Sequence, residues 1–225
     1  MRFSGLAILL LAVTMMTLAG AENAEPPNLV PLNIEYPDHT CPGLPLDWFS
    51  PYPLDTDDLG RCPVRKPVLV PVGARLLSRG KCVTASSTPS KGKLSQITDG
   101  DKACEEPSVV SLPKGLQWVQ VDLGDSATLD ALLLWHWHTG HRVYMQTVVQ
   151  ASDDAVFSKD VFTLFNNDHE NDSGLGKGKN NNYVDGRWGH LIDPKQVKAR
   201  YVRCYSNGSY FDDTNEYIEV EVWGR

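Results

Sequence analysis

Strict alternation over Trp118-Val-Gln-Val-Asp-Leu-Gly124 constrains the fold of this chain more than any other feature. Side chains at 118, 120 and 122 point to one face, and the apolar side chains at 119, 121 and 123 point to the other. A period of two with one apolar face is typical of a strand that covers a core on one side and meets solvent on the other. The Gly124-Asp125 pair then predicts a turn.

Further segments with strand character follow at short intervals. Residues 128–137 are apolar on both faces, which predicts a central strand. The other expected strands are Val143–Ala151, Val161–Phe165, Ala199–Ser206 and Glu216–Trp223, the last with Ile218, Val220 and Val222 on one face. No segment between them predicts an amphipathic helix longer than a turn or two. Short strands separated by turns predict an all-β sandwich or barrel over residues 75–225.

The first 21 residues have the pattern of a secretory signal peptide. Arg2 supplies the positive start, residues 6–18 are apolar, and Ala19-Gly-Ala21 is a small-x-small cleavage site. That apolar stretch is short for a membrane span, and no later segment approaches the required length. We therefore expect a secreted protein, extracellular or in the periplasm or cell envelope, with no membrane insertion.

Residues 22–74 form a Pro-rich N-terminal arm that differs from the rest of the chain. Eleven of the fifteen prolines fall there, and each fixes φ and removes a hydrogen-bond donor. Because Trp48, Phe49 and Tyr52 are too apolar for a pure linker, we expect an extended segment lying across the sandwich. For residues 22–40 a disordered spacer is an equal alternative.

The net charge of −7 limits the classes of partner. It argues against nucleic acid, which favours a basic face, and against anionic membrane, since no Lys and Arg cluster stands beside an amphipathic stretch. Neutral glycans, proteins and divalent cations remain.

Five cysteines follow the signal peptide, and in an oxidising compartment two disulfides and one leftover thiol are expected. Cys41 and Cys62 bracket part of the arm and are expected to staple it. Any two of Cys82, Cys104 and Cys204 are expected to form the second bond. Zinc is disfavoured because the chain has no Cys-x-x-Cys motif.

Six pieces follow one another in the chain from about Gly80 to the C-terminus: Cys82-Val-Thr-Ala-Ser-Ser, Ile97-Thr-Asp-Gly-Asp101, Trp118 to Gly124, Val149-Gln-Ala-Ser-Asp-Asp154, Ala199-Arg-Tyr-Val-Arg203 and Ile218-Glu-Val-Glu-Val-Trp-Gly224. In this order they resemble the discoidin or coagulation factor 5/8 type C family and related carbohydrate-binding modules, the galactose-binding-like jelly rolls. The resemblance implies a jelly-roll β-sandwich that binds a ligand and does no chemistry.

The same resemblance implies a structural calcium ion. Its ligands would be Asp99, Asp101 and one of Glu219 or Glu221, hard oxygen donors of the kind that Ca²⁺ requires. The chain departs from the family at Cys104 and Glu106, which replace a Thr and a nearby Trp. The alternative is an acidic turn that caps itself through its own side chains.

Trp135-His-Trp-His-Thr-Gly-His-Arg142 is the most reactive-looking stretch, and three interpretations stay open. It is a core or turn element, a sugar-binding lip, or a metal site built on His136, His138 and His141. A long polar insertion at 166–189, with seven polar residues at 166–172, is expected to contribute to a lip. The predicted lip residues are His138, His141, Arg142, Asn166, Asn167 and His169, with Tyr144 or Tyr210 as a stacking platform.

No catalytic motif is present: the chain lacks Gly-x-Ser-x-Gly, His-Glu-x-x-His and a phosphate-binding glycine loop. Together with the resemblance, which implies a ligand-binding module, this leads us to expect a secreted, non-catalytic carbohydrate-binding (lectin-like) module that acts at the cell surface or extracellular matrix, with a glycan or cell-surface polysaccharide as partner. One alternative is a protein–protein adhesion module of the cell envelope, which docks through the arm around Trp48 and Tyr52. The other is a small metalloenzyme built on the three histidines.

Overall fold

The computed structural model describes residues 28–38, 44, 48–55, 65–140 and 142–225, and its regular elements are nearly all strands. The one helix among these residues is the short 3-10 element η1 (Leu94–Thr98). The strands are β1 (Leu29–Pro31), β2 (Leu54–Asp55), β3 (Leu69–Pro71), β4 (Arg75–Leu76), β5 (Cys82–Ala85), β6 (Val110–Leu112), β7 (Gln117–His136), β8 (Val143–Tyr144), β9 (Val148–Ser152), β10 (Phe162–Asn166), β11 (Asn182–Val184), β12 (His190–Ile192), β13 (Lys198–Ser206) and β14 (Asn215–Gly224). The expectation of an all-β fold is confirmed.

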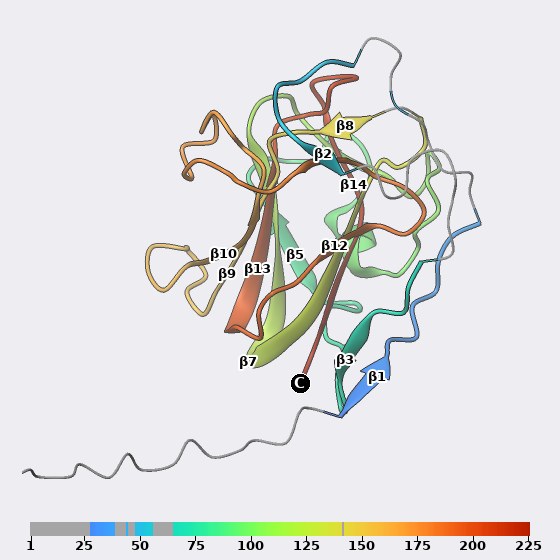
Figure 1. The fold of residues 1–225 in the computed structure, drawn as a ribbon, viewed down its shortest axis with the longest axis vertical. Helices are drawn as coiled ribbons and strands as arrows, with labels where there is room; N and C mark the ends of the chain where they lie inside the picture. The colour runs from blue at the N-terminus through green and yellow to red at the C-terminus, as the bar shows by residue number, and fades with distance from the viewer. Residues whose placement is uncertain (1–27, 39–43, 45–47, 56–64, 141) are drawn as a thin grey trace, which may run out of the picture.

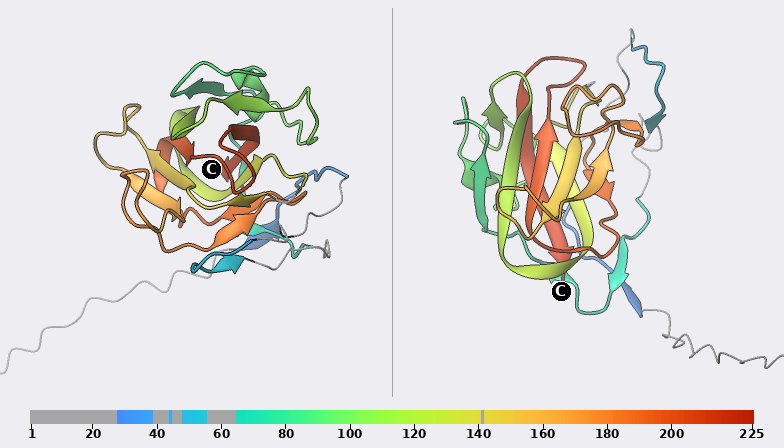
Figure 2. Two further views of the ribbon diagram at one scale, coloured as in Figure 1. Left: turned by 90° about the horizontal axis from the view of Figure 1, so that it is seen from above. Right: turned by 90° about the vertical axis from the view of Figure 1, so that its left-hand side faces the viewer.

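Strand β7 takes part in both layers of the sandwich (Figures 1 and 2). Residues 117–128 pair with β13 and β5, and β13 continues through β9 to β10. Residues 129–136 pair with β14 and β12, and β14 also pairs with β6 and β4. The two halves of one strand therefore hold the two layers together.

The turn expected at Gly124-Asp125 is wrong, because β7 continues through it. Residues 124–126 are exposed, and Gly124 has a φ of 90°. A glycine adopts this backbone conformation without steric cost. The chain thus passes from one layer to the other inside a single strand, and the two expected strands at 117–123 and 128–137 are its halves.

The main core lies between the layers. Val119, Val121, Leu132, Leu134 and Val220 are fully buried in it. The predicted alternation of the first half of β7 is confirmed. Burial of each such side chain stabilises the fold by about 2 kcal/mol relative to exposure.

A second apolar cluster covers the outer face of β7 and β14. Leu133 and Trp135 are fully buried there, with Ile34 and Tyr36 of the arm packed against them. Ile218 joins this cluster instead of the main core, because the pairing of β14 shifts register between Tyr217 and Glu219. The expected central strand, apolar on both faces, is therefore confirmed, and part of its second cover is the arm.

The described parts of residues 22–74, called the arm below, make two pairings. Strand β1 pairs antiparallel with β3, and β2 pairs in parallel with β11. In Figure 1 β1 and β3 lie near the lower edge of the sandwich, while β2 lies near β8 at the opposite end. The arm therefore contacts the sandwich at two separate places. The predicted signal peptide lies outside the described residues.

The polar insertion at 166–189 folds around one buried carboxylate. Asp168 is fully buried; its Oδ1 accepts the Asp172 N–H at 3.0 Å, and its Oδ2 accepts the N–H and hydroxyl of Ser173 at 2.8 and 2.6 Å. These bonds satisfy the buried charge and close the loop. The loop then continues into β11.

The expected disulfide among Cys82, Cys104 and Cys204 is wrong, because none of these three residues is in a disulfide. Cys82 is exposed on β5, Cys204 lies in the main core, and Cys104 lies in the outer cluster. Three different environments separate the thiols. Cys41 and Cys62 lie outside the described residues.

A buried ion pair joins the arm to the outer face. Lys102 is 6% exposed, and its Nζ lies 2.6 Å from Glu221 Oε1 and donates to the Glu35 carbonyl at 2.9 Å. Glu221 Oε2 accepts the Trp223 Nε1–H at 3.0 Å. The two buried charges therefore compensate each other, and the Glu35 carbonyl and the Trp223 N–H supply further hydrogen bonds.

We expect Lys102→Met to lower the free energy of unfolding by about 3 kcal/mol, because it leaves the Glu221 carboxylate buried without its cation. The double variant K102M/E221Q should regain at least about 1 kcal/mol of this loss, since the glutamine is neutral and keeps an acceptor for Trp223. Urea unfolding of the three proteins measures both values. A single variant as stable as the parent would contradict this account.

Candidate functional site

Much of the predicted lip proves to be internal structure. His138 is buried, with Nε2 at 2.9 Å from the Lys102 carbonyl. Tyr144 is buried and donates its hydroxyl to the Trp137 carbonyl at 2.9 Å. Asn167 is fully buried and bonds the backbone of Thr147 and Tyr144. Their polar atoms form hydrogen bonds inside the fold, as buried polar groups do, and are not presented to a ligand at the surface.

Two more predicted residues are also engaged. Asn166 is buried; its amide donates to the Gly176 carbonyl at 2.9 Å and its Oδ1 accepts the Asp168 N–H at 2.8 Å. Arg142 forms ion pairs with Glu216 and, at 3.0 Å, with Asp212. The charge of Arg142 is thus compensated within the protein. His141 lies outside the described residues.

The remaining two predicted residues, His169 and Tyr210, come together with the arm. Tyr52 stacks on His169 with ring centroids 4.1 Å apart, and Trp48 meets Tyr210 edge-on at 5.1 Å. Phe49 stands beside them and is 85% exposed. The arm and the loops at this end of the sandwich therefore build one surface.

This surface encloses a pocket of about 300 Å³, called the aromatic pocket below. Its rings are Phe49, Tyr52, His169 and Tyr210, and its other polar side chains are Ser50, Gln146, Asp168, Glu170, Asp172 and Asn182. Glu170 accepts the Tyr52 hydroxyl, and Asp172 accepts the Gln146 amide. The walls are thus apolar rings with hydrogen-bonding groups beside them.

Gln146, Glu170 and Asp172 were not named as site residues from the sequence. Two of them lie in the polar run 166–172, whose composition did predict a ligand-binding loop. Gln146 carries no such signal, because its role depends on pairing with Asp172 across the pocket.

Among the described residues, His136 and His138 do not come together as metal ligands. His136 is fully buried between the layers, with Nδ1 3.2 Å from the Tyr183 hydroxyl, whereas His138 lies beside Cys104 and Lys102. Strand β7 ends at His136, so His138 lies beyond the strand. Within the ranges that the structure describes, no three His, Cys, Asp or Glu side chains gather as metal ligands.

Three of the four predicted calcium ligands already have partners within the protein. Asp101 accepts the Ala103 N–H and the Ser108 hydroxyl, at 2.9 and 2.8 Å, and Glu221 pairs with Lys102. Asp99 is exposed, and its Oδ1 accepts the Asp101 N–H at 2.9 Å. The loop thus caps itself, as the alternative interpretation expected.

Glu219 is the carboxylate that fits a cation best. It is fully buried; Oε2 accepts the Gly100 N–H at 3.0 Å, and Oε1 has no hydrogen-bond partner. Burial raises the pKa of Glu219 to about 9, against the opposing effect of the Gly100 N–H. Calcium held by Glu219 together with oxygens of the Asp99 loop would satisfy this atom. The calcium ion stays a prediction.

Comparisons with known proteins define the class of fold. No family model matches the sequence, and no curated protein matches it. A family 89 glycoside hydrolase from Clostridium perfringens in complex with PUGNAc has a matching part with a TM-score of 0.51 and 19% identity, which covers 67% of this chain and 14% of that chain. The complex of the same hydrolase with GlcNAc-alpha-1,4-galactose gives a TM-score of 0.50.

Two shorter chains match over most of their length. Chitosan-binding module 1 of a chitosanase/glucanase from Paenibacillus sp. IK-5 is 20% identical, with a TM-score of 0.48, over 67% of this chain and 99% of that module. The CBM32 module of AlyQ is 17% identical, with a TM-score of 0.47, over 63% of this chain and 92% of that module. The fold is a jelly-roll β-sandwich, and the matching part of the hydrolase, at a TM-score of 0.51, supports that fold alone. Because the sequence identities are this low, the ligand of this chain has to be inferred from the geometry of its own site.

We expect Ca²⁺ to raise the melting temperature of the protein, by an amount equivalent to about 2.7 kcal/mol at a concentration one hundred times its dissociation constant. Glu219→Gln should abolish this rise because an amide, unlike the carboxyl group, cannot lose a proton to become an anionic ligand for the cation. Asp101→Asn, whose carboxylate is already used inside the loop, is the matched control and should retain the rise. Thermal unfolding with calcium and with chelator checks this; identical melting curves for the parent protein would contradict it.

Proposed function

We propose that this protein is a non-catalytic carbohydrate-binding protein that holds a glycan in the aromatic pocket. The observation that carries the proposal is the convergence of Phe49, Tyr52 and Tyr210 with amide and carboxylate groups around about 300 Å³. A pocket of that volume lies at the lower end of the range for small-molecule sites.

The pocket's chemistry suits a pyranose ring. The apolar face of a sugar packs on an aromatic ring, while its hydroxyls donate to carboxylates and accept from amides. Phe49 offers an exposed ring face, and Gln146 and Asp172 supply the two kinds of hydrogen-bonding group. A largely apolar partner would leave the polar groups without water or hydrogen bonds, which costs free energy.

The charge of the pocket favours neutral or amino sugars. Its acidic side chains are those of Asp168, Glu170 and Asp172, no Lys or Arg is among its described lining residues, and the chain as a whole has a net charge of −7. An anionic glycan would be repelled by this field. We therefore expect sulfated and uronic acid-rich glycans to bind more weakly than neutral ones.

Two features support binding without catalysis. Glu170 and Asp172 are two residues apart on one loop, and each already accepts a hydrogen bond inside the protein. A glycosidase needs two carboxyl groups that face each other across the scissile bond. A pocket that is open to solvent, like the aromatic pocket, binds a single sugar weakly, with a dissociation constant of about 0.1–1 mM. Retention on a glycan surface would then require several copies of the protein to bind together.

Secretion and action at the cell surface or extracellular matrix belong to the same proposal, through the predicted signal peptide at 1–21. Among the described residues no helix is long and apolar enough to cross a membrane. Adhesion to an envelope protein through Trp48 and Tyr52 is the second candidate. Because these rings pack on Tyr210 and His169, the adhesion surface and the aromatic pocket share residues.

A glycan array separates the two candidates, and we expect binding to one class of neutral or amino sugar. Phe49→Ala and Tyr210→Ala should each lower the affinity about tenfold, equivalent to about 1.4 kcal/mol of lost ring contact. Phe162→Ala is the matched control, because Phe162 is 44% exposed on β10 outside the pocket and should leave binding unchanged. Titration calorimetry with the best sugar from the array measures the three affinities.

The proposal fails if folded, multivalently presented protein binds nothing on the array, or if the control variant weakens binding as much as the two pocket variants. A blank array together with retention on an envelope protein would favour adhesion.

A further inference from the structure

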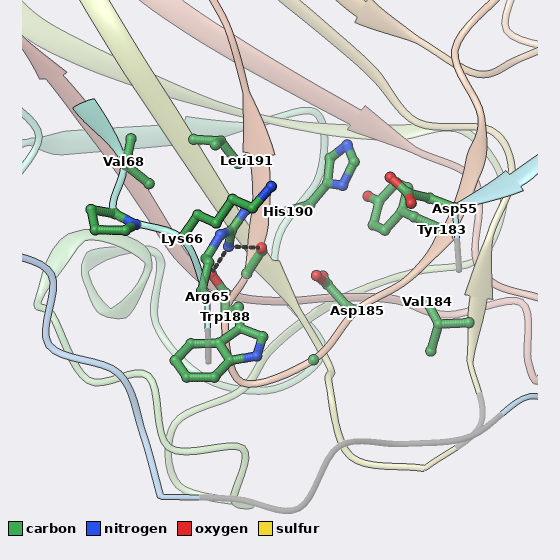
Figure 3. A pocket seen from close by; sticks show the side chains of 13 residues that line it. Asp55, Arg65, Lys66, Val68, Tyr183, Val184, Asp185, Trp188, His190 and Leu191 are labelled. Atoms are coloured by element: carbon green, nitrogen blue, oxygen red, sulfur yellow. Dashed lines mark hydrogen bonds between the residues drawn. The ribbon is translucent and has the colours of Figure 1, made fainter. Parts of the chain in front are cut away.

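A second and larger cavity, of about 590 Å³, lies between residues 65–68 of the arm and the segment 183–191 (Figure 3). Arg65 and Lys66 line it from the arm, and Tyr183, Asp185, Trp188 and His190 line it from the sandwich. We call it the polar pocket. It shares no lining residue with the aromatic pocket.

Three side chains of the polar pocket carry a buried polar atom with no hydrogen-bond partner. These atoms are Asp185 Oδ1, Trp188 Nε1 and His190 Nε2. Asp185 is 2% exposed, and its other oxygen accepts the His136 N–H at 2.8 Å. Each unpaired buried group costs about 1–3 kcal/mol, and folded proteins tolerate few of them. Three around one cavity indicate a partner that belongs inside it.

The unpaired groups are held in place by their neighbours. Tyr183 stacks on the His190 ring with centroids 3.8 Å apart, and Phe165 meets that ring edge-on at 4.6 Å. Such packing fixes the imidazole in one orientation, as a binding site requires.

The backbone of the segment is held as well. Arg65 donates to the carbonyls of Trp188 and Gly189, at 2.6 and 2.9 Å. Gly189 has a φ of 64°, and a Cβ there would overlap the ring of Trp135. Tyr36 packs edge-on against Trp188 at 4.8 Å. The pocket is therefore largely pre-formed, which lowers the entropic cost of binding.

The unpaired atoms define what the ligand must offer. The Asp185 carboxylate accepts hydrogen bonds only, and the Trp188 indole N–H donates only. Burial lowers the pKa of His190 to about 4, so at neutral pH this ring is uncharged, and its Nε2 either donates or accepts. Hydroxyl groups both donate and accept, so adjacent hydroxyls on one ring meet all three requirements.

The charges around the cavity point to a neutral ligand. Lys66 and Arg65 are balanced by Asp55 and Asp185, all four in the lining. Figure 3 shows Lys66 reaching over the pocket from the arm, with Asp185, Trp188 and His190 around it. A ligand with a net charge would be attracted by the two side chains of opposite sign and repelled by the two of like sign.

We propose that the polar pocket is a second ligand site, which binds a neutral mono- or disaccharide through hydroxyl contacts to Asp185, Trp188 and His190. The volume exceeds that of the aromatic pocket and lies within the range for small-molecule sites. This site does not depend on the function proposed for the aromatic pocket.

The test uses the double variant F49A/Y210A, in which the aromatic pocket is disabled. Titration with a panel of neutral mono- and disaccharides should still detect one that binds. Adding Trp188→Phe keeps the aromatic ring and removes its N–H, and should lower that affinity about tenfold. Trp118→Phe is the matched control, because Trp118 lies on β7 outside the pocket, and it should leave the affinity unchanged.

A direct readout accompanies the titration. In the ¹H–¹⁵N spectrum of the double variant, the indole N–H signal that Trp188→Phe removes should shift when the bound sugar is added, because that N–H acquires an acceptor. Failure of every sugar in the panel to bind the F49A/Y210A protein would overturn the proposal and leave water as the content of the pocket. So would an unchanged affinity in the Trp188→Phe protein. If only the proposal for the aromatic pocket is wrong, the result is different. The F49A/Y210A protein would then bind the sugar as the parent protein does, and only Trp188→Phe would weaken that binding.

Discussion

The backbone ladder of β7 is the interaction on which the rest of the structure depends. Its first half bonds to β13 and β5 in one layer and its second half to β14 and β12 in the other. Because one strand belongs to both sheets, the layers cannot shift relative to each other without breaking its hydrogen bonds. This arrangement fixes the positions of the loops at the strand ends. It also fixes the segment that carries β11 and β12.

The second half of β7 has a further consequence, because both of its faces are apolar. Leu132 and Leu134 fill the space between the layers, and Leu133 and Trp135 need a cover on the outside. The arm supplies part of that cover through Ile34 and Tyr36, and Lys102 ties it to Glu221. The chain segment that looks least structured in sequence is thus part of the folded unit.

The sequence predicted the sandwich well because the signal is local. Alternation at 117–123 reports directly which side chains are buried, and each strand carries its own version of that signal. It predicted the site poorly because burial of polar groups is a tertiary property. Asn167 and His138 look like exposed ligand contacts in sequence, yet each bonds to backbone atoms brought there by the fold. The same limit applies to Ile218. Its side chain lies on the outer face because the pairing of β14 shifts register beside it, and such a shift leaves no trace in the hydrophobic pattern of the sequence.

His169 was predicted as a polar lip residue in the run 166–172, and Tyr210 as a stacking platform. Their partners Phe49 and Tyr52 lie more than a hundred residues away in sequence and were assigned to a different hypothesis. Only the folded chain shows that the two hypotheses describe one surface.

The arm supplies one wall of each pocket: Phe49 and Tyr52 in the aromatic pocket, Arg65 and Lys66 in the polar pocket. The opposite walls come from the sandwich, whose strands fix them. Substitutions in these four arm residues can therefore change what each pocket accepts while the sheets keep their pairing. In evolutionary terms, these four residues belong to no strand, so under the proposed functions binding preference can diverge at these positions while the strand pairing is kept.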